Sequence, residues 1–159
     1  MTLDDLAALD TDALQDLYRN ARTPAIADVQ GDLEGRLLAV IRAGAVRGAL
    51  RWLASRKAFP WRGKTFKALS AERGEGINRV FGDEGGMRWF RFETYLAPSR
   101  AGAFDAFQLD YDNPQNPFFI RAIKDEIREV APGLYLGQAY LEISGKPRLA
   151  LYFGLCKPS

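Results

Sequence analysis

The chain has 159 residues, of which 47% are hydrophobic and 26% are charged, and this composition fits one globular domain with a sizeable core. Lys and Arg number 22 against 20 Asp and Glu, so the net charge of +2 provides no strong field for nucleic acid. The chain has no histidine and one cysteine, which excludes histidine-based triads, histidine metal sites, thiolate zinc sites and internal disulfides.

The apolar residues are too scattered for a membrane span, because no run of about eighteen apolar residues occurs. The first ten residues, MTLDDLAALD, carry acids where a secretory signal needs positive charge, so we expect a cytoplasmic protein. Any acid–base chemistry must come from carboxylate, Tyr or Lys side chains with displaced pKa values. We expect no cofactor and no metal.

The N-terminal segment is typical of two short helices. Thr2 can cap the first helix, and Thr11 can begin the second. Apolar residues from Leu14 to Tyr18 recur at helical spacing, which gives the second helix one apolar face. We therefore expect a helical segment over residues 1–23.

The next stretch predicts the first strand and an inserted helix. Residues 25–41 alternate loosely between apolar and polar, and Gly31 and Gly35 within them indicate a bend. Residues 43–57 have the periodicity of an amphipathic helix. We expect residues 24–159 to form one barrel that carries this helix as an insertion, so that residues 1–159 are a single domain.

The rest of the chain alternates with period two, as β-strands do. We expect a turn at residues 74–78, and a second turn at residues 144–147 that joins the last two strands. Because no helices separate the strands, the sheet should be antiparallel, and closing it into a barrel would remove its edges. The clearest strands span residues 87–96, 103–111, 134–143 and 149–156.

Residues 108–137 combine charges, prolines and aromatic residues, a composition that is costly to keep in a solvated connector. We expect residues 112–132 to form a lid over the barrel mouth, with Phe118 and Phe119 facing the interior. Adjacent residues cannot share one helix face, so at least one of the two rings should be buried. The ion pairs above them would come from Arg121, Asp125, Glu126 and Arg128.

Three short motifs resemble a known family. The sequence Gly31-Asp32-Leu33-Glu34-Gly35 resembles the G-x-W-x-G signature of the GXWXG domain, with Leu33 where the family has Trp. Residues 60–66, PWRGKTF, are similar to that family's W-x-G-K-x-F motif. Residues 111–114, 121–125 and 136–137 follow the order and spacing of a DUF4334-type segment. The resemblance spans roughly residues 14–155 and implies a lipocalin-like (calycin) barrel, but no particular activity.

We therefore expect a mainly β protein, with a single antiparallel lipocalin-like barrel, N-terminal helices and one inserted helix. A small barrel of this kind either fills its interior or keeps a cavity for one ligand. On strand 87–96, one face carries Trp89, Arg91, Glu93 and Tyr95 and could point inward to bind a polar group. Alternatively the other face, with Phe90, Phe92 and Leu96, points inward, while Arg91 and Glu93 form a solvated pair on the outside.

Two further groups of residues are open to more than one interpretation. Trp61, Arg62 and Lys64 could grip an anionic group, or Trp61 could plug the barrel end while both cations are solvated. Asp110 and Asp112 share a strand face. They could act as acid and base, bind a hard cation together with Glu126, or cap the backbone of the turns that follow.

The function that we expect is binding of a small lipophilic molecule with a polar or anionic group in the barrel cavity. The alternative is a cofactor-independent isomerase, cyclase or lyase, for which Asp110, Asp112, Glu93, Tyr95 and Tyr135 are candidate acid–base groups. The candidate ligand-binding residues are Trp61, Arg62, Lys64, Trp89, Arg91, Tyr95, Phe118, Phe119, Arg121 and Tyr135.

Overall fold

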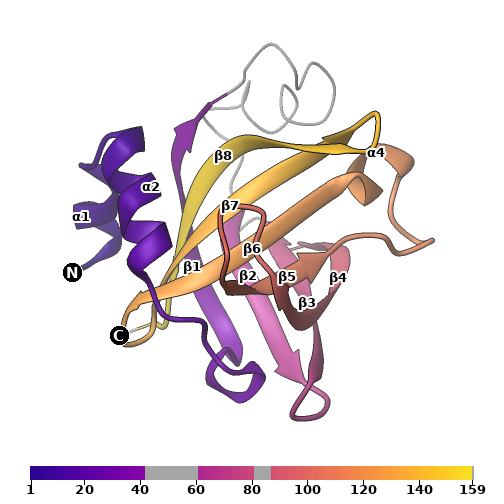
Figure 1. Cartoon of the computed structure of the whole chain (residues 1–159). Coiled ribbons are helices and arrows are strands. Elements are labelled where there is room, and N and C mark those ends of the chain that lie inside the picture. The colour runs from indigo at the N-terminus through magenta and orange to yellow at the C-terminus, as the bar shows by residue number, and fades with distance from the viewer. Residues whose placement is uncertain (42–60, 81–86, 159) are drawn as a thin grey trace.

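The computed structural model describes residues 1–41, 61–80 and 87–158, and its centre is a closed barrel of antiparallel strands (Figure 1). Each strand pairs with the next along the chain, and the last pairs with the first. The strands are β1 (Gly31–Val40), β2 (Trp61–Ala68), β3 (Arg73–Val80), β4 (Met87–Pro98), β5 (Asp105–Asp110), β6 (Ile123–Ala131), β7 (Leu134–Ile143) and β8 (Lys146–Cys156).

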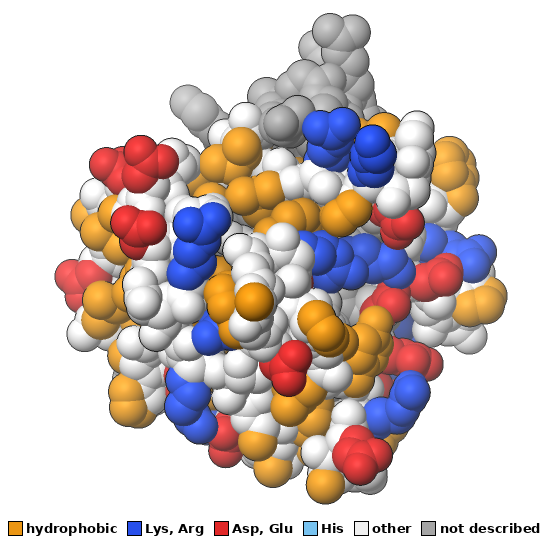
Figure 2. Space-filling model, in the orientation of Figure 1, with side chains coloured by type: hydrophobic (Ala, Val, Ile, Leu, Met, Phe, Trp, Pro, Cys, Tyr) orange, Lys and Arg blue, Asp and Glu red, His pale blue; other side chains and the backbone are white. Residues whose placement is uncertain are grey.

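This up-and-down order of eight strands is the lipocalin-like arrangement, so the predicted fold class is confirmed. Closure leaves no unpaired sheet edge, which is the physical advantage that the sequence reasoning had assumed. The inserted helix predicted at residues 43–57 lies outside the described residues. The face in Figure 2 intersperses Lys and Arg with Asp and Glu, in keeping with the small net charge.

The two N-terminal helices form as predicted and cover the outside of the barrel. Helix α1 (Leu3–Ala7) is capped by Thr2, and α2 (Thr11–Asn20) by the Asp10 side chain. Both lie against the same side of the barrel in Figure 1. The apolar face of α2, with Leu14 and Tyr18, is fully buried against the outer surface of β7 and β8. This packing, more than the length of either helix, keeps the segment in place.

Two predicted loops are strands instead. Residues 112–132 were predicted to be a lid, but β6 takes up nine of them and pairs with both β5 and β7. Residues 74–78 were predicted to be a turn, but they lie in the middle of β3. The absence of a side chain at Gly76 lets the Phe92 ring pack against the backbone of β3, because a Cβ atom there would lie 2.3 Å from that ring.

The short 3-10 helix η1 (Ile26–Asp28), which precedes β1, closes one end of the barrel. Its Ile26 and the following Val29 are buried in the barrel core. In an antiparallel barrel, even strands begin where odd strands end. The beginnings of β2 and β6 and the ends of β3 and β5 therefore lie at the opposite end, next to the short helix α4 (Phe118–Arg121).

Candidate ligand-binding site

Four polar side chains are buried together inside the barrel, and we call them the interior cluster: Lys64, Asn78, Tyr111 and Asp125. Each lies near the start of β2 or β6, or near the end of β3 or β5, so the barrel topology brings all four to one end. None is more than 8% exposed. Buried charges are rare unless they are paired, so this group calls for a physical account.

The Lys64 ammonium group is the hub of the interior cluster. Its Nζ donates to Asn78 Oδ1 at 2.8 Å, to Asp125 Oδ2 at 3.2 Å and to the Tyr111 hydroxyl. The Tyr111 hydroxyl donates to Asp125 Oδ2 at 3.1 Å and accepts from Asn78 Nδ2 at 3.2 Å. The amine is therefore fixed by partners on β3 and β6 and by Tyr111, which directly follows β5.

Aromatic rings enclose the same amine. The centroids of the Trp61, Phe92, Tyr111 and Phe153 rings lie between 5.2 and 5.6 Å from Lys64 Nζ. Ring faces attract a cation, but they cannot replace the water that burial removes. Burial accordingly lowers the pKa of Lys64, although Asp125 acts in the opposite direction.

The two acids of the cluster respond to burial in the opposite sense. Burial raises the pKa of Asp125, against the opposing effect of Lys64, and it raises the pKa of Tyr111 well above its ordinary value. Asp125 Oδ1 is also buried, and it has no hydrogen-bond partner among the described residues. A buried acceptor without a donor is uncommon, so the cluster has capacity for one more donor.

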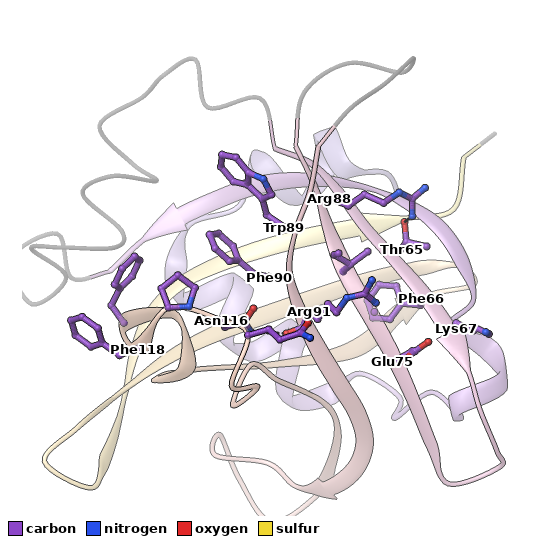
Figure 3. Close-up of a pocket in the computed structure, with 15 residues that line it drawn as sticks. Thr65, Phe66, Lys67, Glu75, Arg88, Trp89, Phe90, Arg91, Asn116 and Phe118 are labelled. Atoms are coloured by element: carbon purple, nitrogen blue, oxygen red, sulfur yellow. Dashed lines mark hydrogen bonds between the residues drawn. The ribbon is translucent and has the colours of Figure 1, made fainter.

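A cavity of about 1120 Å³ lies beside this cluster, between β2, β3, β4 and the segment that leads into α4 (Figure 3). Its apolar wall includes Phe66, Trp89, Phe90 and Phe118. In Figure 3, Trp89, Phe90 and Phe118 lie on one side of the site. The cavity is thus large enough for a ligand, and much of its wall is aromatic.

Its charged wall is predominantly basic. The cations Lys67, Arg88 and Arg91 line it, against the single acid Glu75. In Figure 3, Arg88, Lys67 and Glu75 lie on the side away from Phe118. Arg88 donates to Thr65 Oγ1 at 3.2 Å, whereas the Arg91 guanidinium has no ion-pair partner within the described parts of the chain.

A bulge in β4 brings Phe90 into contact with both the interior cluster and the cavity. The pairing of β3 with β4 shifts register between Ile77 and Asn78, and Phe90 has a φ of 60°, which is unusual for a bulky residue. The Phe90 carbonyl accepts from Asn78 Nδ2 at 3.3 Å, while the Phe90 side chain lines the cavity. The Phe66 ring also lines the cavity and lies 5.4 Å from that of Phe92. Lys67, Glu75 and Arg91, which also line the cavity, alternate with inward-facing residues of β2, β3 and β4, so this part of the cavity lies against the outer face of the barrel wall.

The structure decides which face of strand 87–98 points inward. Phe92 and Thr94 are buried, whereas Arg91 and Glu93 are exposed. Glu93 lies 3.7 Å from Arg73, and not against Arg91. The second of the two alternatives for this strand is therefore correct for Phe92, Arg91 and Glu93, but Leu96 is 43% exposed and the partner of Glu93 is Arg73. Arg91 lines the cavity from the outer face of the strand.

The ten candidate ligand-binding residues fall into three groups. Trp89, Arg91, Phe118 and Phe119 line the cavity, and Trp61 and Lys64 belong to the barrel interior. The remaining four lie elsewhere. Arg62 is exposed, Tyr95 is half-buried on the outer face, Arg121 pairs with Asp112, and Tyr135 donates to the Asp28 carbonyl at the closed end.

The candidate carboxylates on β4 and β5 point away from the interior. Asp110 accepts from Lys124 and from the Tyr95 hydroxyl, and Asp112 pairs with Arg121 at 2.7 Å. Glu126 lies on the outside, under α2, and bonds to neither of them. No group of three His, Cys, Asp or Glu that could hold a metal occurs in the described part of the chain.

The expected burial of the two adjacent Phe residues is wrong. Phe118 is 84% exposed and Phe119 is 40% exposed, while the next residue, Ile120, is 2% exposed. The single turn of α4 directs one of these three side chains inward, and that side chain is the aliphatic Ile120. The proposed ion-pair lid is also wrong, because Asp125 lies inside the barrel and Arg128 donates to the carbonyls of Ala21 and Asp105.

Sequence reasoning did not assign Asn78, Tyr111 or Asp125 to a ligand site. A signal was available for Asp125, which alternates with Ile123 and Ile127 on the inner face of β6. A charged residue at an inward position of an alternating strand is a candidate site residue. The strand itself had to be recognised first.

Comparison with known proteins supports the fold alone. No family model matches the chain, and no curated protein matches it. A crystal structure of a protein from Thermomonospora curvata is similar, with a TM-score of 0.57 and 19% identity over 95% of this chain and 89% of that one. The resemblance to GXWXG and DUF4334-type segments stays a prediction. No helix among the described residues is long and apolar enough to cross a membrane.

Proposed function

We propose that the protein binds a small lipophilic molecule that carries a polar or anionic group. The observation that carries this proposal is the cavity of about 1120 Å³, with aromatic residues on its wall and three cations against one acid. Ligand pockets are commonly about 300–1,000 Å³, mainly apolar, with a few placed polar groups that orient the ligand. This cavity has the size and the lining of such a pocket.

The two parts of the wall have separate roles. The rings of Phe66 and Phe90 favour an apolar ligand body, because burial of apolar surface is worth about 25 cal/mol per Å². Arg91, without an ion-pair partner among the described residues, favours an anionic group at the rim. Together they select a molecule with an apolar body and a negatively charged end.

A pair of fluorescent probes tests this division. We expect 1-anilinonaphthalene-8-sulfonate, a lipophilic anion, to bind saturably, and its uncharged analogue N-phenyl-1-naphthylamine to bind as well. Arg91→Gln should weaken binding of the anion by about fivefold, which corresponds to about 1 kcal/mol. It should leave binding of the neutral analogue unchanged.

Arg148→Gln is the matched control, because Arg148 is exposed on β8 and is not among the residues that line the cavity. The variant should bind both probes as the wild type does. If neither probe shows saturable binding, or if Arg148→Gln weakens anion binding as much as Arg91→Gln, the proposed site is wrong. Native mass spectrometry of the protein from its own source would then identify any co-purifying ligand.

A second candidate function is cofactor-independent isomerase, cyclase or lyase chemistry, and the interior cluster favours it. Asp125 and Tyr111 are buried acids with raised pKa values, in contact with a buried amine. Such perturbed groups are typical of acid–base sites. They replace the outward-facing Asp110, Asp112, Glu93 and Tyr95 as candidates. Incubation with a small-molecule extract of the source cells tests this function, because a compound consumed by the wild type should persist with Asp125→Asn.

A further inference from the structure

We propose that Lys64 captures a carbonyl-bearing ligand, an aldehyde in particular, by forming a reversible imine inside the barrel. This inference rests on the proposed function, because the ligand would reach Lys64 from the adjoining cavity. It adds a covalent step and names a chemical class, neither of which follows from the cavity alone.

The surroundings of Lys64 suit a nucleophilic amine. An amine attacks a carbonyl only in its uncharged form, and burial among apolar groups favours that form. Lys64 is 3% exposed, and four aromatic rings surround its amine. Burial also lowers the pKa of Lys64. The other lysines that the structure describes lack this set of features. Lys67 and Lys146, for example, are exposed.

The neighbours of the amine supply the proton transfers. Asp125 Oδ2, at 3.2 Å from Nζ, takes a proton from the Lys64 ammonium group and leaves the free amine. The amine nitrogen then bonds to the carbonyl carbon as the C=O π bond breaks, and one proton passes from the nitrogen to the carbonyl oxygen to give a carbinolamine. Asp125 or Tyr111 donates a proton to the carbinolamine hydroxyl, which leaves as water, and the remaining nitrogen proton returns to that group as the C=N bond forms. No oxidant or reductant is consumed.

The unpartnered oxygen of Asp125 supports the same chemistry. Asp125 Oδ1 is buried and accepts no hydrogen bond within the described residues. The hydroxyl of a carbinolamine is a donor of the kind that this oxygen lacks. A carboxylate ligand would instead bring a second negative charge next to Asp125, which is unfavourable in a buried site. A neutral carbonyl compound therefore fits the cluster better than an acid does.

The route from the cavity to Lys64 is apolar. Phe66 and Phe90 line the cavity, and Phe92 lies between Phe66 and the Lys64 amine. Rotation of ring side chains would open this wall without breaking a buried ion pair. A flat lipophilic aldehyde is consequently the form of ligand to test.

Reductive trapping tests the inference on the unmodified protein. The protein is incubated with 6-methoxy-2-naphthaldehyde and sodium cyanoborohydride at about pH 6.5, where exposed lysines are almost fully protonated. We expect one dominant adduct on Lys64, because its lowered pKa leaves a larger fraction of its amine uncharged at this pH than in an exposed lysine. Reduction blocks trypsin at Lys64, so the adduct should appear on the peptide that spans residues 63–67.

Variants make the assignment specific. Asp125→Asn should slow trapping by at least about tenfold, because it removes the base but keeps the side-chain shape. Lys64→Met/Asp125→Leu should remain folded and give no adduct at position 64. Lys146→Met, at the exposed first residue of β8, should leave the yield at Lys64 unchanged.

Two results overturn the inference. One is an adduct spread over exposed lysines with Lys64 unmodified, and the other is trapping at Lys64 that Asp125→Asn does not slow. The proposed function is judged separately. Saturable binding of the lipophilic anion without an adduct would reject the imine and keep the binding site, whereas loss of both would reject both.

Discussion

Asp125 and Glu126 are neighbours on β6 that face opposite sides of the barrel wall, and both are buried. Asp125 points into the barrel, where Lys64 and Tyr111 donate to Oδ2 and Oδ1 has no partner among the described residues. Glu126 points outward, beneath α2. Two acids one residue apart thus have very different degrees of hydrogen-bond satisfaction.

We call the environment of Glu126 the outer cluster: Tyr18, Ser99, Arg100, Gln108 and Glu126. Oε1 accepts from the Tyr18 hydroxyl at 2.9 Å and from Ser99. Oε2 accepts from the Arg100 backbone at 3.1 Å, from the Arg100 side chain at 3.2 Å and from Gln108 at 3.4 Å. This acid ties α2 and the connection between β4 and β5 to the barrel.

The difference separates a structural network from a candidate site. A buried carboxylate with both oxygens fully bonded stabilises the arrangement around it. A buried carboxylate with one open acceptor, next to a buried amine and a cavity, is poorly explained by stability alone. The outer cluster therefore serves folding, and the interior cluster is where we expect ligand chemistry.

The largest expected effect follows from removing Glu126. Glu126→Ala should lower the free energy of unfolding by roughly 3–5 kcal/mol, because Tyr18 is left buried without its acceptor and Arg100 loses its charge partner. Urea unfolding measures this. Glu93→Ala is the control, since Glu93 pairs with Arg73 at the exposed surface and should cost at most about 1 kcal/mol. Equal losses in the two variants would contradict the structural role of the outer cluster.

The interior pair should behave differently when both charges are removed together. Asp125→Leu alone leaves Lys64 buried and unpaired, and it should cost roughly 3–5 kcal/mol. Lys64→Met/Asp125→Leu should recover most of that loss, or exceed the wild type in stability, because an apolar pair avoids the desolvation of two ions. Unfolding of all three proteins gives the coupling energy. A double variant that is as unstable as Asp125→Leu would show that the pair is kept for folding.

A smaller, pH-dependent effect distinguishes Asp125 from the outward-facing Asp110. Burial favours a higher pKa for Asp110, but the bonds from Lys124 and the Asp112 backbone outweigh it and lower the pKa below 3.8. Its contribution to stability is therefore present above pH 3.8 and is lost as the pH falls through the folded-state pKa. Burial raises the pKa of Asp125 above 3.8, so its contribution is largest below pH 3.8 and is lost as the pH rises.

Urea unfolding over a pH series checks both signs. The stability difference between wild type and Asp110→Asn should shrink as the pH falls from about 5 to about 2. The stability of the wild type relative to Lys64→Met/Asp125→Leu should fall as the pH rises from about 4, because the Asp125 contribution is lost. Lys64 should restore stability at the alkaline end, because its lowered pKa makes its contribution fully present only above pH 10.5. If the contributions of Asp110 and Asp125 to stability change in the same direction with pH, the environments of the two carboxyl groups do not differ as described.

The sequence predicted the parts of the fold whose burial pattern is regular. The Thr2 cap of α1, the start and apolar face of α2, and the strands β4 and β7 are visible in the sequence and confirmed in the structure. Strand β6 was missed because charged residues occupy its outer face and Asp125 interrupts its inner face. The turn predicted at residues 74–78 is wrong because its two glycines do not reverse the chain: Gly76 leaves room for the Phe92 ring, and Gly74 leaves room for the Thr94 side chain.

The site was less predictable than the fold. Trp61 and Lys64 are recognisable in the sequence as an aromatic residue and a cation close together. Asn78 on β3, Tyr111 directly after β5 and Asp125 on β6 are far apart in the sequence, and only closure of the barrel brings them together. Phe118 and Phe119 were expected inside because they are aromatic. The orientation of α4 depends on Ile120 and on packing that no local pattern encodes.

The most direct test of the central claim is a pH titration of the lysine side-chain amines by NMR, with ¹⁵N at Nζ. The account predicts one resonance with a midpoint clearly below 10.5, absent from Lys64→Met/Asp125→Leu and perturbed by a lipophilic aldehyde. If every lysine titrates together and none responds to the aldehyde, the interior cluster is an ordinary buried ion pair and the claim is wrong.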